Sequence, residues 1–414
     1  MRKLKITICF LFSLGVLCNA QNKREWIEDI DYYHKTLEQK HIDLYHTISK
    51  EQFSLEIEKL KTSLDSLTDF QIIIELMRLT QTIGGGKSDG HTSIPLWDRK
   101  LSQYPIKLFD FDGEIRVVST VRKHKHLLGR KLHSIDGVSI DTIYKKVSEL
   151  APFTENKYSL MDRTCRYMVV SEILKSVHII KYSAYAKFTF LDVDGSQESV
   201  ILNSYDEEEL ISLDYATLSV THPNIKPPEN SSLKDLWFTS LNNSETVFID
   251  FKGYPSQEEM DKFSRSVFDF IDFNSSKHLI IDLRDNYGGD LFVGLVLARW
   301  LNLSDSINWK SNVYVLVNRK TYSAAMVNAI QFRQLLNAKI IGEPSGANPR
   351  GYQDMGQFSL PNSKLLVNYS KRLFRLQERN MQSIQPDVFI TPQWRNYKKG
   401  IDEALNWVLE DLNK

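Results

Sequence analysis

The sequence predicts a mixed α/β protein of several domains, and three patterns support this fold class. Near the N-terminus, apolar residues recur at spacings of three and four, which is typical of amphipathic helices. In the middle of the chain, short apolar runs flank Asp-Gly pairs, which are typical of hairpins. Beyond residue 232, apolar strands alternate with helical segments, which indicates βαβ crossovers and a buried, mainly parallel sheet.

Residues 1–20 have the composition of a secretory signal. Basic residues within the first five positions precede the apolar run "ITICFLFSLGVL", and small residues stand just before Gln21. We therefore expect an exported protein, periplasmic or extracellular. Lipid anchoring through Cys18 is the alternative, although Leu17 stands where such a signal has a small residue.

Composition excludes several classes of function. The 52 basic residues balance the 52 acidic ones, so no global field attracts nucleic acid or an anionic membrane, and no later apolar run is long enough to span a bilayer. Beyond the predicted signal Cys165 is the one cysteine, so no internal disulfide is expected. Isolated histidines without HExxH or paired CxxC spacing favour a protein that needs no metal, and no organic cofactor is expected. The oligomeric state stays open.

Residues 21–95 are expected to form a helical region that ends in a loop containing His91. Helical spacing extends from Trp26 to about Ile83, and the three glycines of "IGGGKSDGHTSI" then disfavour a helix. Residues 100–155 are expected to form a small mixed module, with a hairpin in "YPIKLFDFDGEIRVVST" and a strand, turn and helix in "LHSIDGVSIDTIYKKVSEL".

Residues 156–232 are predicted to be a β-containing insertion and linker, and residues 233–414 the core domain. The insertion has a strand pair, "YAKFTFLDVDGSQESVIL", and ends in the proline-rich "PNIKPPENSS". In the core we expect strands at "TVFIDF", "HLIIDL", "VYVLV" and "AKIIGE", with a helix between each strand and the next.

Three loops follow core strands: "DLRDNYGGD", "NRKTYSAAM" and "EPSGANPRG". Open α/β sheets bind ligands at the carboxyl ends of their strands, so we expect the chemistry here. In the second loop Ser323 precedes a helix, and this position has two interpretations. In the first, the side chain of Thr321 or Ser323 caps the helix, and in the second, Ser323 is a nucleophile. In the nucleophile interpretation the amide of Ala324 also donates to an oxyanion.

The glycine pair of the first loop has two interpretations as well. Gly288 and Gly289 allow close approach of the backbone to a ligand, and one of their amides is a candidate for the second oxyanion donor. Alternatively the pair forms only a turn before the next helix.

Together, "HLIIDLRDNYGGD", "VYVLVNRKTYSAAMVNAI", "AKIIGEPSG" and "IQPDVFI" resemble the core of the C-terminal processing (tail-specific) serine peptidases and of their relatives, the tricorn core protease and interphotoreceptor retinoid-binding protein. "GRKLHSIDGVSIDTIYKKV" is similar to the PDZ segment of that family and "DGHTSI" to its upstream histidine motif. The resemblance implies a crotonase-like protease core of ββα layers, a PDZ-like module that adds a peptide end to a sheet edge, Ser323 as nucleophile, and an oxyanion hole from the amides of Ala324 and of Gly288 or Gly289.

The general base departs from the processing-protease branch, which carries a lysine in a "GKG" turn. Here the corresponding stretch reads "SGANPRG", and Arg350 cannot act because a guanidinium keeps its proton. We expect His91 to be the base, as in the tricorn-like branch, because histidine titrates near neutrality. Glu378 is the expected residue that orients His91, and Asp89 is the alternative.

These features predict an exported serine endopeptidase that hydrolyses peptides or unstructured proteins through an acyl-enzyme. A non-catalytic protein that holds a peptide or an apolar ligand on the same scaffold is the alternative. A hydrolase of non-peptide esters is a third interpretation, since the acyl-transfer groups are the same.

Overall fold

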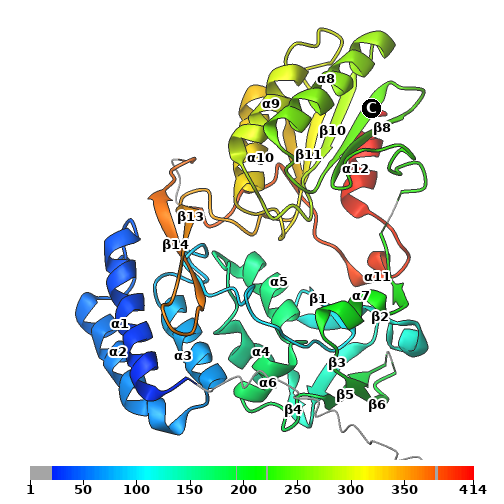
Figure 1. Ribbon diagram of the computed structural model, residues 1–414. Coiled ribbons are helices and arrows are strands. Elements are labelled where there is room, and N and C mark those ends of the chain that lie inside the picture. Colours follow the sequence, from blue (N-terminus) through cyan, green and yellow to red (C-terminus); the bar gives the residue numbers. More distant parts are fainter. Residues whose placement is uncertain (1–20, 193, 221, 378–380) are drawn as a thin grey trace, which may run out of the picture.

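The computed structural model describes residues 21–192, 194–220, 222–377 and 381–414. The predicted export signal, residues 1–20, lies outside these ranges. Figure 1 shows two halves, the lower with the N-terminal helices beside one sheet and the upper with a second sheet between helices. None of the helices within these ranges has the length and apolar character that crossing a bilayer requires.

Three helices form the N-terminal region, as the apolar spacing predicts. Each begins at an Asn, Ser or Thr whose side chain accepts a hydrogen bond from an amide of the first turn. Their apolar faces pack into a cluster that also contains residues of the lower sheet. After the third helix Gly84 and Gly86 have positive φ, so the helix stops and the chain turns toward His91. The helices are α1 (Lys23–Lys40), α2 (Lys50–Ser63) and α3 (Asp69–Gln81).

The lower half also contains a seven-stranded sheet with the order β1-β2-β3-β5-β6, in which β4 pairs with β3 and β7 with β2. Asp-Gly turns join β1 to β2 and β5 to β6, as expected from the sequence. The strands are β1 (Ile106–Phe111), β2 (Glu114–Val121), β3 (Lys131–Ile135), β4 (Val138–Ser139), β5 (Tyr185–Leu191), β6 (Gln197–Asn203) and β7 (Tyr215–Thr217). The helices are α4 (Ile140–Ser148), α5 (Lys157–Tyr167), α6 (Ser171–Ser176) and α7 (Glu207–Ser212).

The predicted boundary at residue 155 falls inside this sheet. Strand β3, from the 100–155 segment, pairs with β5, and β2 pairs with β7, so the 156–232 segment completes the same sheet. Unpaired strand edges favour such pairing, but the sequence does not show which strands meet. A PDZ-like fold for residues 100–155 stays a prediction. Residues 223–232 contain no helix or strand and connect β7 with the upper half.

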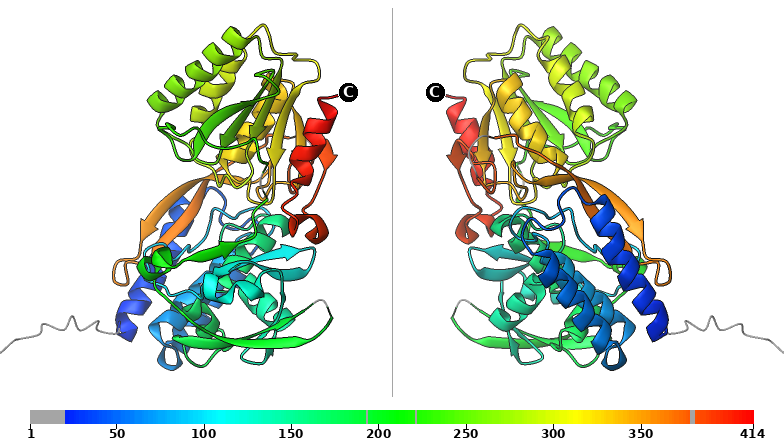
Figure 2. Two further views of the ribbon diagram at one scale, coloured as in Figure 1. Left: turned by 90° about the vertical axis from the view of Figure 1, so that its right-hand side faces the viewer. Right: turned by 90° about the vertical axis from the view of Figure 1, so that its left-hand side faces the viewer.

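The upper half is built on a six-stranded sheet with the order β15-β12-β11-β10-β9-β8. All neighbours are parallel except β8 and β9, as the alternation of strands and helices predicts. Helices α8, α9 and α10 cover one face and α12 covers the other (Figure 2). The strands are β8 (Leu236–Leu241), β9 (Thr246–Phe251), β10 (His278–Asp282), β11 (Val313–Val317), β12 (Lys339–Gly342) and β15 (Val388–Phe389). The helices are α8 (Gln257–Asn274), α9 (Leu291–Leu301), α10 (Ala324–Leu335), α11 (Trp394–Tyr397) and α12 (Glu403–Asp411).

A hairpin of β13 (Tyr352–Ser359) and β14 (Leu366–Leu373) leaves the upper half and packs against the N-terminal helices, as Figure 1 shows. Phe358 and Val367 belong to the same apolar cluster as the core of those helices. At the hairpin turn, backbone amides donate to the buried carboxylate of Asp29 on α1. The hairpin therefore ties the two halves together on one side.

A pair of carboxylates lies at the carboxyl ends of two parallel strands of the upper sheet. Asp250 on β9 faces Asp282 on β10 and is 4% exposed. Burial raises the pKa of Asp250 to about 6, and the Asp282 carboxylate adds to this effect, whereas Lys252 and Arg284 oppose it. Because the pKa in the folded protein lies above the unfolded value of about 3.9, this group favours folding below pH 4, and the contribution disappears as the pH rises through 6.

The Asp250→Asn variant is expected to be more stable than the wild type at pH 8 by about 2 kcal/mol, because asparagine cannot ionise. At pH 4.5 the difference should be much smaller. Thermal unfolding at both pH values measures it, with the exposed Asp305→Asn as control. An equal shift of the Asp250→Asn variant at both pH values contradicts the assignment.

Candidate active site

Ser323 lies in the loop between β11 and α10 and has an unusual backbone. Its φ of 50° and ψ of −125° are costly for a residue with a side chain, and such strain is concentrated at functional sites. The side chain makes no cap hydrogen bond to α10, and the Thr321 hydroxyl donates to the Leu283 carbonyl oxygen instead. The helix-cap interpretation is therefore wrong for both residues. The Ser323 Oγ atom lies 3.0 Å from His91 Nε2.

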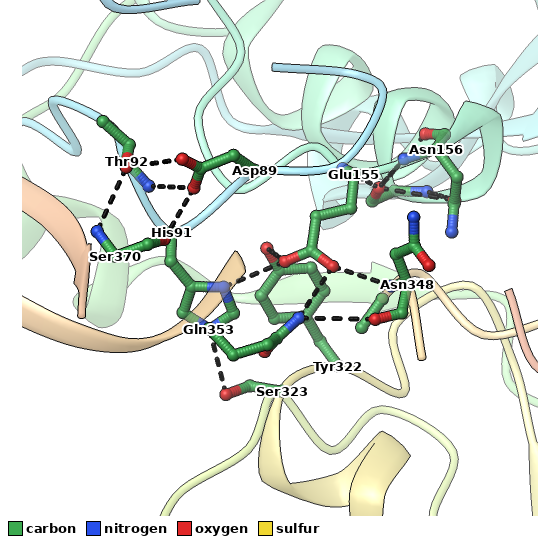
Figure 3. Close-up of polar contacts among 12 residues, drawn as sticks. Asp89, His91, Thr92, Glu155, Asn156, Tyr322, Ser323, Asn348, Gln353 and Ser370 are labelled. Atoms are coloured by element: carbon green, nitrogen blue, oxygen red, sulfur yellow. Dashed lines mark hydrogen bonds and ion pairs between the residues drawn. The ribbon is translucent and has the colours of Figure 1, made fainter. Parts of the chain in front are cut away.

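His91 lies in the loop after α3, in the lower half, and is 4% exposed. Its ring stacks on the Tyr322 ring with a centroid distance of 5.2 Å. Nδ1 lies 2.9 Å from Glu155 Oε1, so the imidazole stands between a hydroxyl and a carboxylate (Figure 3). With Nδ1–H donating to Glu155, Nε2 keeps its lone pair for the serine proton. The structure thus brings together two residues that the sequence predicts for the site.

Glu155 precedes α5 and is fully buried. Oε1 accepts hydrogen bonds from His91 and from the Tyr322 hydroxyl, the latter at 2.6 Å. Oε2 accepts hydrogen bonds from the backbone N–H of Asn348 at 2.7 Å and from the side-chain Nε2 of Gln353 at 3.0 Å. Four hydrogen bonds fill the acceptor capacity of an ionised carboxylate. Burial, followed by the Glu155 charge and hydrogen bond, raises the pKa of Tyr322 well above its usual value, so this hydroxyl remains a donor.

Sequence reasoning missed Glu155, because no motif surrounds it and 64 residues separate it from His91. The expected Glu378 lies outside the described residues. The alternative, Asp89, is hydrogen-bonded to His41, Thr92 and Ser370 rather than to His91.

The glycine loop lies directly against Ser323. At Gly288, with φ of 102°, an added Cβ atom would stand 2.7 Å from Ser323 Cβ, so only glycine fits. Its N–H donates to Asn286 Oδ1 at 2.9 Å. Within the described ranges the amides of Gly289 and Ala324 have no internal acceptor, which leaves these two as the candidate oxyanion donors.

In the processing branch a lysine lies in the loop that corresponds to "SGANPRG" of this chain. Here the backbone N–H of Asn348 in that loop donates a hydrogen bond to Glu155 Oε2. The nearest downstream lysines lie on the hairpin, where Lys371 pairs with Asp354 and Lys364 donates to the Pro361 carbonyl oxygen. Across the described part of the chain, no cluster of three or more His, Cys, Asp or Glu residues could hold a metal.

Comparisons with known proteins agree with this architecture. Residues 246–390 match the model of peptidase family S41. Mature CPAF aligns with a TM-score of 0.64 at 13% identity, and the alignment covers 94% of this chain and 98% of that chain. Mature CPAF complexed with lactacystin aligns with a TM-score of 0.62 at 12% identity, and the alignment covers 94% of this chain and 97% of that chain. The tricorn protease gives a TM-score of 0.44 at 13% identity, over 94% of this chain and 36% of that chain. No curated protein sequence matches.

The CPAF likeness shows a shared fold. The chain carries a domain of a serine-type peptidase. Specifically, residues 246–390 form a peptidase family S41 domain, so the resemblance seen in the sequence is confirmed at the level of the family.

The glycine before His91 gives a test of how closely the two halves must approach. At Gly90 an added Cβ atom would lie 2.5 Å from the Tyr322 hydroxyl and 2.9 Å from Glu155 Cγ. Gly90→Ala should displace His91 and lower the turnover of peptides about a hundredfold. Lys87→Ala, in the same loop but at an exposed side chain, should change turnover little. Equal turnover in both variants and the wild type contradicts the required approach.

Proposed function

We propose that the protein is an exported serine endopeptidase that cleaves peptides or unstructured proteins through an acyl-enzyme. Ser323 is the nucleophile, His91 the general base, and Glu155 the residue that orients His91. The observation that carries this proposal is the continuous chain of contacts from Ser323 Oγ to His91 Nε2 and from His91 Nδ1 to Glu155 Oε1. Residues so distant in sequence meet in the order that nucleophilic catalysis requires.

Acylation begins when Ser323 Oγ attacks the carbonyl carbon of the scissile bond. The hydroxyl proton passes to His91 Nε2 as the carbon–oxygen bond forms, and the electron pair of the carbonyl moves to its oxygen. The amides of Gly289 and Ala324 donate to this oxyanion. Glu155 accepts from Nδ1–H throughout and stabilises the imidazolium.

The intermediate collapses when the oxyanion re-forms the carbonyl and the carbon–nitrogen bond breaks. His91 gives its proton to the leaving amine, so the first product departs neutral. Water then attacks the carbonyl carbon of the acyl-enzyme while His91 Nε2 takes a proton from it. As the bond between that carbon and Ser323 Oγ breaks, His91 returns the proton to Oγ and the acid product leaves. No metal or organic cofactor enters any of these steps.

A cavity of about 1310 Å³ between the halves supports an extended substrate. It is lined by Asp285 from the glycine loop before α9, by Lys320 from the loop that also carries Ser323, and by Trp97 from the segment after His91, together with β1 and α5 of the lower half. Ser323, His91 and Glu155 are not among the lining residues, so the cavity lies beside the catalytic contacts and not around them. Pockets of this size hold ligands larger than most small molecules. An unfolded peptide can enter such a cleft, and we propose that residues 100–155, for which the family resemblance implies a PDZ-like module, add a peptide end to a sheet edge.

Reaction with a fluorophosphonate and degradation of fluorescein-labelled casein test the proposal together. The wild type should be labelled and should degrade casein. Ser323→Ala should lose both activities and His91→Ala several orders of magnitude of turnover, with thermal stability changed by about 1 kcal/mol or less for the serine variant. An unlabelled, inactive wild type would instead favour the binding-protein interpretation.

Lysine and glutamate variants separate the proposed site from its alternatives. Lys364→Ala and Lys371→Ala should keep turnover within about twofold, whereas Glu155→Gln should lower it at least a hundredfold and Glu378→Gln should not. The pH profile adds a second readout, because a histidine base loses activity below neutrality, whereas a lysine base gains activity above it. An essential downstream lysine with a dispensable His91 is incompatible with this mechanism.

A further inference from the structure

Asp89 is a buried carboxylate two residues before His91, and the proposed mechanism does not use it. Its side chain is 0% exposed. Oδ1 accepts hydrogen bonds from the Thr92 amide at 3.0 Å and the Ser370 hydroxyl at 2.6 Å. Oδ2 accepts from the Thr92 hydroxyl at 2.9 Å and from His41 Nε2 at 2.7 Å. Since a buried carboxylate is costly without partners, this set of four donors is required as a whole.

The His41 partner is fixed in one tautomer. The Asp43 amide donates to His41 Nδ1 at 3.0 Å, so the ring proton stands on Nε2 and points at Asp89. Burial by itself raises the pKa of Asp89, but the hydrogen bonds from His41, Ser370 and Thr92 outweigh it and lower the pKa. Asp89 therefore remains an acceptor at neutral pH.

These bonds join the His91 loop to two other elements. His41 is the C-cap residue of α1, and Ser370 lies on β14. The backbone N–H of Ser370 also donates a hydrogen bond to the Thr92 hydroxyl at 3.1 Å. Figure 3 shows Asp89, Thr92 and Ser370 on one side of the loop and the His91 ring directed toward Ser323 on the other. On that side Gly90 fits against Tyr322 and Glu155 without room for a methyl group.

We propose that Asp89 is a positioning residue of the peptidase site, which holds the loop so that His91 reaches both Ser323 and Glu155. Its own hydrogen bonds go to His41, Thr92 and Ser370, so it acts through the position of His91 and not through the substrate. The inference rests on the proposed function, because it assigns the loop a task in the same reaction. It also gives His41 and Asp89, a second buried histidine–carboxylate pair besides His91 and Glu155, a role without a second catalytic centre.

Asp89→Asn is the direct test. The asparagine amide would oppose the donors of His41 and Thr92, so the loop must shift. We expect kcat on fluorescein-labelled casein and the rate of fluorophosphonate labelling to fall tenfold to a hundredfold, while KM stays within about threefold. Ser370→Ala, which removes one donor and leaves the carboxylate, should lower both rates about threefold to tenfold.

Asp29→Asn is the matched control. Asp29 is also fully buried, lies on α1 and accepts hydrogen bonds from the amides of Asn362 and Ser363 in the hairpin turn. The substitution should lower the melting temperature as Asp89→Asn does, yet keep kcat within about twofold at a temperature well below melting. A merely structural role of Asp89 predicts the same kcat for both variants.

Each result decides the inference. The inference is overturned if Asp89→Asn keeps the kcat and the labelling rate of the wild type. It is also overturned if Asp29→Asn loses as much kcat as Asp89→Asn does. If Asp89→Asn does not fold, Ser370→Ala decides in its place, and unchanged labelling there overturns the inference. A wild type that is not labelled, or labelling that persists in Ser323→Ala, removes the proposed function and the inference with it. If labelling and turnover depend on Ser323 and His91 but are unchanged in Asp89→Asn, the proposed function stands and only the inference is removed.

Discussion

The carboxylate of Glu155 is fully buried, and the site is assembled around it. Leaving such a group without partners costs several kcal/mol, so its donors must all arrive when the protein folds. His91 comes from the loop after α3, Tyr322 from the loop before α10, Asn348 from the loop after β12 and Gln353 from β13. Glu155 and His91 belong to the lower half, Tyr322 and Asn348 to loops that follow strands of the upper half, and Gln353 to the hairpin, so satisfying this one group brings the halves together.

A second buried charge contributes to the same alignment. Arg319, four residues before Ser323, forms a buried ion pair with Glu343 and also donates to the Asp110 carbonyl oxygen of β1 at 2.7 Å. The loop of Ser323 is thus attached to the lower sheet, where His91 must meet it. The strained backbone of Ser323 costs about 1–3 kcal/mol and persists only where its surroundings fix it. The Tyr322 amide, which donates to the Asn286 carbonyl oxygen, is one such constraint.

Much of the fold could be predicted from the sequence, because helices and strands follow local periodicity. The helices near the N-terminus, both Asp-Gly hairpins and the parallel order of the upper sheet agree with the expectation. The pairing of β3 with β5 and the docking of the β13–β14 hairpin could not be predicted, since both depend on contacts between distant segments. In the site, Ser323 and His91 stand in recognisable local motifs. Glu155 has none, and only the fold reveals that it is buried beside His91.

The account's central claim is that His91 and Glu155 of one half activate Ser323 of the other. A crystal structure of the protein after reaction with a fluorophosphonate tests this claim most directly. The account predicts a phosphonyl group on Ser323 Oγ, its oxygen within hydrogen-bond distance of the Gly289 and Ala324 amides, and the His91 ring still bonded to Glu155. A phosphonyl group on another residue, or a His91 ring oriented by Glu378 with Glu155 turned away, would contradict it.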